Sequence, residues 1–184
     1  MPLLIIVAIA ALLAVAAVIG IYNALVALRQ RVRSGWSQIQ VMLKRRHDLI
    51  PNLVETVKGY AGHERETLER VIAARGAAVS AGSPAQLSQA EGVLTGALGR
   101  LFALAESYPE LKADQSFRAL QAELASTEEG VAGARSGYNQ VVTEYNTRVQ
   151  SFPAVLLAGA MGFQAEEYFE LESAAEKETP KVRF

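Results

Sequence analysis

The chain has 184 residues, a formal net charge of −1 and no cysteine. Without cysteine it can form no disulfide framework, lipoprotein anchor or cysteine-based metal site. Its charge leaves no broad basic surface, which argues against nucleic acid as a main partner.

The first element is an uncharged apolar run from Leu3 to Ile21. At about 1.5 Å per residue it covers roughly 28 Å, close to the thickness of a bilayer's hydrocarbon core. The alternative is a cleaved signal peptide, which has a basic segment before a shorter apolar core, whereas only Met1 and Pro2 precede this run. We expect residues 1–28 to form one transmembrane helix with a short N-terminus outside, with Tyr22 at headgroup depth.

A cluster of basic residues follows the apolar run, and no acidic residue lies among them. The six residues are Arg29, Arg31, Arg33, Lys44, Arg45 and Arg46. Positive charge next to a span stays on the cytoplasmic side, so the pattern predicts a cytoplasmic body. The rest of the chain carries a formal charge of −7, because the whole chain carries −1.

The next predicted element is a long helix, in which apolar residues recur at steps of three and four from Leu28 to Val71. Pro51 interrupts this pattern. Proline has no N–H to donate to the carbonyl of His47, so we expect a kink or a restart, with Asp48 as the N-cap of a restarted helix.

Two further helices are predicted after a loop at residues 81–83. Ser83-Pro84-Ala85-Gln86 has the form of a capping box, and it opens an apolar seam that runs from Leu87 to Tyr108 and ends at Pro109. Asp114 is the expected N-cap of the last long helix, which Pro153 ends. Its seam comprises Phe117, Leu120, Leu124, Thr127, Val131, Ala134, Tyr138, Val141, Tyr145, Val149 and Phe152.

The C-terminal part begins with an apolar stretch, Ala154 to Phe163, that is too short to span a bilayer. It is expected to dip into the membrane interface, to contact another subunit, or to cover the end of the helical body. An acidic amphipathic turn with Tyr168, Phe169 and Leu171 follows, and residues 177–184 are predicted to be a flexible tail.

Strand signals are absent from the pattern. The sequence therefore predicts an all-α protein: an N-terminal transmembrane helix, then an antiparallel, up-and-down-like four-helix bundle over residues 29–176. Its long helices are expected to be kinked and to pack through coiled-coil-like seams.

The most specific pattern in the chain is the segment Leu43-Lys-Arg-Arg-His-Asp-Leu-Ile-Pro-Asn-Leu-Val-Glu-Thr-Val-Lys-Gly-Tyr-Ala-Gly-His-Glu64, here called the signature segment. It resembles the signature of the LemA family of bacterial membrane proteins. Other blocks of the chain match that family in order: Tyr22-Asn23, Ala105-Glu106, Tyr108-Pro109, Tyr138-Asn139, Tyr145-Asn146, Phe152-Pro153 and Gly162-Phe163. The chain departs from the family at Ala154-Val155, where many relatives carry asparagine.

The resemblance implies one N-terminal span in the bacterial inner membrane, an N-terminus outside and a cytoplasmic helical bundle. One branch of the family is associated with the magnetosome membrane, which points to scaffolding or to membrane organisation.

Two groups of residues are candidate functional sites. The first is the basic group Arg29, Arg31, Arg33, Lys44, Arg45 and Arg46, which would contact anionic lipid or an acidic partner, or form a solvated face that sets topology. The second surrounds the expected break and comprises Asp48, Pro51, Asn52, Glu55, Lys58 and His63. It would bind a polar ligand or a partner, or else serve as caps and ion pairs.

Catalytic and metal-binding motifs do not emerge from the sequence. His47 and His63 lack the Glu-x-x-His spacing of di-iron bundles. No phosphate loop, zinc motif or nucleophile–base pair is recognisable. We expect no enzyme activity, cofactor or metal.

The leading functional hypothesis is a scaffold or adaptor that binds membrane or cytoplasmic proteins and can self-associate. The alternative is a protein that organises the membrane or contacts lipid.

Overall fold

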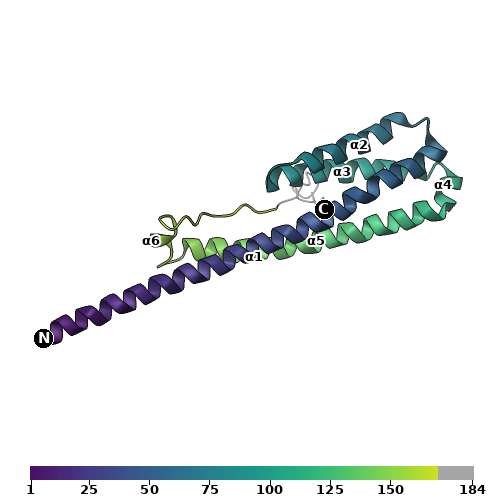
Figure 1. Ribbon diagram of the computed structural model, residues 1–184. Coiled ribbons are helices and arrows are strands. Elements are labelled where there is room, and N and C mark those ends of the chain that lie inside the picture. Colours follow the sequence, from purple (N-terminus) through teal and green to yellow (C-terminus); the bar gives the residue numbers. More distant parts are fainter. Residues whose placement is uncertain (170–184) are drawn as a thin grey trace, which may run out of the picture. The chain divides into compact units, whose positions relative to one another are not determined.

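The computed structural model describes residues 1–169, so the tail predicted for residues 177–184 lies outside the described part (Figure 1). Among the described residues all regular structure is helical, which confirms the predicted all-α class. The elements are α1 (Pro2–Ala61), α2 (Arg65–Ser80), α3 (Pro84–Ala105), α4 (Pro109–Ala113), α5 (Gln115–Gln150) and α6 (Val155–Ala158).

Contacts divide the chain into two units, and α1 and α5 contribute to both. Unit 1 consists of residues 1–37 and 136–166. Among the described residues, unit 2 consists of residues 38–135 and 167–169.

Unit 1 contains the apolar start of α1, which is long and apolar enough to cross a membrane and is almost entirely exposed. Figure 1 shows this part of α1 extending alone past the end of α5. Burial begins at Ile21 and Leu25, next to Tyr22, whose ring packs against Phe163. Gly35 allows the close approach of α5, because a Cβ built there would lie 3.4 Å from the Tyr138 Cα.

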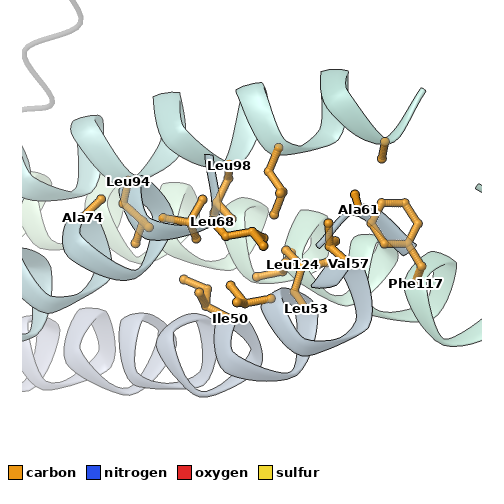
Figure 2. Close-up of a cluster of buried hydrophobic side chains, with 14 of the residues drawn as sticks. Ile50, Leu53, Val57, Ala61, Leu68, Ala74, Leu94, Leu98, Phe117 and Leu124 are labelled. Carbon is orange, nitrogen blue, oxygen red and sulfur yellow. The ribbon is translucent and has the colours of Figure 1, made fainter. Parts of the chain in front are cut away.

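Unit 2 is built around one apolar core to which α1, α2, α3, α4 and α5 all contribute. Figure 2 shows core side chains from α1, α2, α3 and α5. Its fully buried members include Ile50 and Leu53 from α1, Val71 from α2 and Leu94 from α3. Phe117 and Leu124 of α5 are also buried there. Parts of the seams predicted from steps of three and four therefore meet in the interior of unit 2.

The break predicted near Pro51 is corrected by the structure. α1 continues through Pro51 without a restart, and Asp48 caps no helix. α1 instead ends at Ala61, and Gly62, His63 and Glu64 form a turn before α2. The spacing of apolar residues had predicted helix across this turn. Gly62 suits this turn, because a Cβ there would lie only 3.0 Å from the Lys58 carbonyl oxygen. A kink at Pro51 stays a prediction.

Two predicted helix caps are confirmed. Ser83 Oγ accepts from the Gln86 amide at 3.3 Å, and the Gln86 side chain accepts from the Gly82 amide at 3.1 Å. Asp114 Oδ1 accepts from the Phe117 amide at 2.8 Å and so caps α5. Ser83 and Asp114 each satisfy an amide that the first helical turn leaves free.

The predicted seam of α5 is mostly confirmed, because Phe117, Leu124 and Tyr145 are buried. Two positions differ. Val142 is fully buried while Val141 is half-buried, and Phe152 is 80% exposed. Phe152 lies beyond the end of α5, so the helical spacing no longer sets its direction. Residues 164–169 form no helix, and Phe169 is buried.

Candidate functional site

A buried ionic cluster links α1 to α3 inside unit 2. Arg46 Nη1 donates to Glu91 Oε2 at 3.0 Å, and His47 Nε2 lies 2.6 Å from Glu91 Oε1. The three side chains are at most 8% exposed. Because a carboxylate only accepts, the His47 tautomer with a proton on Nε2 fits this contact. Glu91 thus uses both of its oxygens to hold two consecutive residues of the signature segment.

Arg46 makes further contacts across the interior. Its Nη2 donates to Thr95 Oγ1 at 2.9 Å and lies 3.9 Å from Glu128 Oε1. Its Nε is buried without a hydrogen-bond partner. A buried charge is tolerated only when it is paired, so Glu91 is what permits a guanidinium in this interior.

Pro51 leaves the carbonyl of His47 without its helical partner, as the sequence predicted. The structure shows what replaces that partner. Arg75 Nε, from α2, donates to the His47 carbonyl oxygen at 2.8 Å. Pro51 therefore leaves the His47 carbonyl free to accept a hydrogen bond that links α2 to α1.

Some residues of the signature segment line two open grooves at α1 and α2, here called the α1–α2 face. The first groove, of about 330 Å³, lies at Lys44, His47 and Asp48 of α1 and Arg75 and Val79 of α2. The second, of about 590 Å³, is lined by Val54, Glu55, Lys58, Gly62, Arg65, Leu68, Glu69 and Ile72. Ile72 is 55% and Val79 is 59% exposed. The face thus offers apolar side chains flanked by charges of both signs.

A pair of tyrosine–carboxylate contacts joins the end of the signature segment to α4. The Tyr60 hydroxyl donates to Asp114 Oδ2 at 3.0 Å, and the Tyr108 hydroxyl donates to Glu64 Oε1 at 3.2 Å. The hydrogen bond to Asp114 raises the pKa of Tyr60, and desolvation followed by the Glu64 contact raises the pKa of Tyr108. The signature segment and the block around Tyr108 therefore meet in space.

Most of the predicted basic group is engaged within the chain. Arg29 lies over the Phe163 ring, 4.7 Å from its centroid, and Arg31 pairs with Glu144 at 2.9 Å. Arg33 is exposed. Lys44 pairs with Asp48 at 2.8 Å, Arg45 pairs with Glu123, and Arg46 pairs with Glu91. Arg46 is therefore not part of a solvated face. Exposed ion pairs are weak, so a contact role for the other five stays a prediction.

The residues predicted around the break do not form one cluster. Asp48, Glu55 and Lys58 line the α1–α2 face, and Lys58 lies 3.4 Å from Glu55. The hydrogen bond from Lys44 lowers the pKa of Asp48. Pro51, Asn52 and His63 are exposed. Among residues 1–169, no three His, Asp or Glu side chains are close enough to hold a metal ion.

In unit 1, the chain after α5 folds back onto α1. The Phe163 ring packs edge-on against Tyr22, with centroids 5.6 Å apart. Asn146 Nδ2 donates to the Glu166 carbonyl oxygen at 2.9 Å, and Asn146 Oδ1 accepts from the Glu166 amide at 2.8 Å. Burial raises the pKa of the neighbouring Tyr145. Ala154, Ala158 and Phe163 are buried within the chain, and the three outcomes expected for Ala154 to Phe163 stay predictions.

Sequence reasoning missed three residues that organise the buried cluster: Arg75, Glu91 and Thr95. The burial of Glu91 could have been predicted from the sequence, because Glu91 occupies an apolar position of the helix between Leu87 and Leu94. A carboxylate at such a position needs a cation as its partner. Arg75 and Thr95 could not have been recognised from the sequence, since arginine and threonine are common on the solvent side of helices.

Comparison with known proteins gives matches along most of the chain. The sequence matches the model of the LemA family over residues 35–184. Magnetosome protein MamQ of Magnetospirillum gryphiswaldense is 26% identical over 189 residues, which cover 88% of this chain and 70% of that protein. Magnetosome protein MamQ 1 of Paramagnetospirillum magneticum is 25% identical over 84% of this chain and 66% of its own length. Protein LemA of Metamycoplasma hominis is 27% identical over 73% of this chain and 62% of that protein. The chain spans about two thirds of the length of these relatives.

Proposed function

Because the chain belongs to the LemA family, we propose that it is a single-pass membrane scaffold or adaptor that binds other proteins and catalyses no reaction. The apolar start of α1 spans the bacterial inner membrane with its N-terminus outside. The rest forms an up-and-down four-helix bundle at the cytoplasmic surface. The positive charge between positions 29 and 46 supports this orientation.

The observation that carries the proposal is the α1–α2 face. Residues of the signature segment supply both its structure and its surface: the His47 side chain contacts the buried Glu91, and the exposed Lys44, Asp48, Glu55 and Lys58 line the grooves. Exposed apolar side chains surrounded by charges are typical of protein-binding surfaces. Ile72 and Val79, seven residues apart on one side of α2, give a partner two apolar anchors.

Photo-cross-linking in cells tests this proposal. A photoreactive amino acid replaces Ile72 or Val79 in the full chain, and Gln121, which is exposed on α5 of the same unit, serves as the matched control position. We expect discrete cross-linked products from the two α2 positions and none from position 121. A product of two copies of the chain would identify self-association.

A charge reversal then tests whether the signature segment is responsible for binding the cross-linked partner. Glu55→Lys combined with Lys58→Glu keeps the pair but reverses its polarity, and it should abolish the cross-links while helicity is unchanged. Identical products from all three positions, or none from α2, would contradict a scaffold that binds through this face.

A further inference from the structure

An uncharged stretch of chain, residues 151–165, follows α5 and is here called the membrane-proximal segment. It has two sides. Ala154, Ala158 and Phe163 are at most 2% exposed. Phe152 and Leu156, in contrast, are 80% and 71% exposed. An exposed pair of large apolar side chains next to a packed face indicates a surface that meets something other than water.

The position of this segment along α1 identifies what it meets. Phe163 packs on Tyr22, the first residue after the apolar run. Ile19 is 55% exposed and Ile21 is 8% exposed, so burial of α1 begins where the apolar run ends, beside the Tyr22–Phe163 contact. A run of roughly 28 Å fills the hydrocarbon core, which puts Tyr22 at headgroup depth.

We propose that the exposed side of the membrane-proximal segment inserts into the interface of the same bilayer that α1 crosses, with Phe152, Val155 and Leu156 as its apolar contacts. This goes beyond the proposed scaffold role, but it rests on the proposed span. The segment is too short to cross the bilayer, and lipid is the occupant that continues directly from the surface of α1.

The chemistry of the segment fits an interface. It has no charged side chain to desolvate, and its backbone turns are hydrogen-bonded internally, as in Val155 N to Ser151 O at 2.9 Å and Phe163 N to Ala158 O at 2.9 Å. Arg29, stacked on Phe163, keeps a cation beside the phosphate layer. Apolar side chains beside such a cation are the pattern of an interfacial anchor.

Fluorescence depth measurement on the full chain in liposomes tests the proposal. The chain has no cysteine, so a single introduced cysteine carries an environment-sensitive fluorophore without background. The liposomes contain phosphatidylcholine and phosphatidylglycerol, with a spin label either near the headgroup or deep in the acyl chain. The variants are Leu156→Cys, Ile9→Cys inside the span, and Gln140→Cys as an exposed control in unit 1.

We expect Leu156→Cys to lose most of its emission with the headgroup-proximal spin label and less with the deep one. Ile9→Cys should be quenched by the deep label, and Gln140→Cys by neither. Adding Phe152→Ser should reduce quenching at position 156 while the circular dichroism spectrum stays helical.

Three results would overturn the proposal, and they are distinguishable. If Leu156→Cys behaves like Gln140→Cys while Ile9→Cys is quenched, the span exists without the second contact. A blue-shifted Leu156→Cys signal that neither label quenches means that protein covers the segment. An unquenched Ile9→Cys means that the span, and the proposal with it, is wrong.

Discussion

Glu91 gives the sharpest prediction for a single residue. Replacing it with Gln removes the buried counter-charge of Arg46, whose own side chain is 4% exposed. Breaking a buried pair from one side costs about 3–5 kcal/mol, because the remaining charge stays desolvated. We expect Glu91→Gln to lower the free energy of unfolding by about that amount in urea titrations of the detergent-solubilised chain.

Glu128 provides the matched control for this change. It also lies near Arg46, at 3.9 Å, but its side chain is 55% exposed. Glu128→Gln should change the unfolding midpoint little. Equal effects of the two substitutions would show that water reaches Arg46 and that the cluster is not a sealed interior pair.

Asp114 gives a prediction about pH. The Phe117 amide, and next the Tyr60 hydroxyl, hold the pKa of this carboxyl below its ordinary value of 3.8. A lowered folded-state pKa stabilises the fold above the ordinary value, and this contribution disappears as pH falls through the folded-state pKa. The melting temperature of the native chain should therefore exceed that of Asp114→Asn at neutral pH.

This difference should shrink as the pH falls below 3.8. Asparagine still caps a helix, so the comparison isolates the charge and its attraction to the start of α5. A difference that is independent of pH would contradict an ionised cap.

At the scale of elements, Pro51 of α1 and Arg75 of α2 act together, because Pro51 frees the His47 carbonyl to which Arg75 donates. Arg75→Ala should destabilise the chain, because the His47 carbonyl loses its donor. In a Pro51→Ala background residue 51 regains an N–H that can reach that carbonyl. The cost of Arg75→Ala should then be smaller, and a double-mutant cycle of unfolding free energies measures the coupling. Additive effects of the two substitutions would mean that Arg75 acts through its groove-facing contacts instead.

The same elements show how far sequence reasoning reaches. The caps Ser83 and Asp114 were predictable because a cap depends on residues only three positions apart. The effect of Pro51 on the His47 carbonyl was predictable for the same reason. The donor from Arg75 was not, because it depends on which helix lies opposite. The turn at Gly62 was missed because the apolar spacing continues across it in Leu68 and Val71.

At the scale of the whole molecule, the topology yields a direct prediction. With the N-terminus outside, a membrane-impermeant maleimide should label Pro2→Cys in intact spheroplasts. It should label Ser136→Cys, which is exposed in unit 1, only after lysis. The expectation follows from the basic residues that come after the apolar run. The opposite labelling pattern would place the body outside and would contradict a cytoplasmic scaffold.

The contact between Asn146 and Glu166 has a consequence for how the sequence can vary. The Asn146 amide bonds to the backbone N–H and carbonyl of residue 166, and these two bonds do not involve the side chain at position 166. Selection should therefore accept many residues at position 166, apart from proline, which has no N–H. It should accept almost nothing in place of Asn146, because aspartate has no donor and glutamine is one methylene longer.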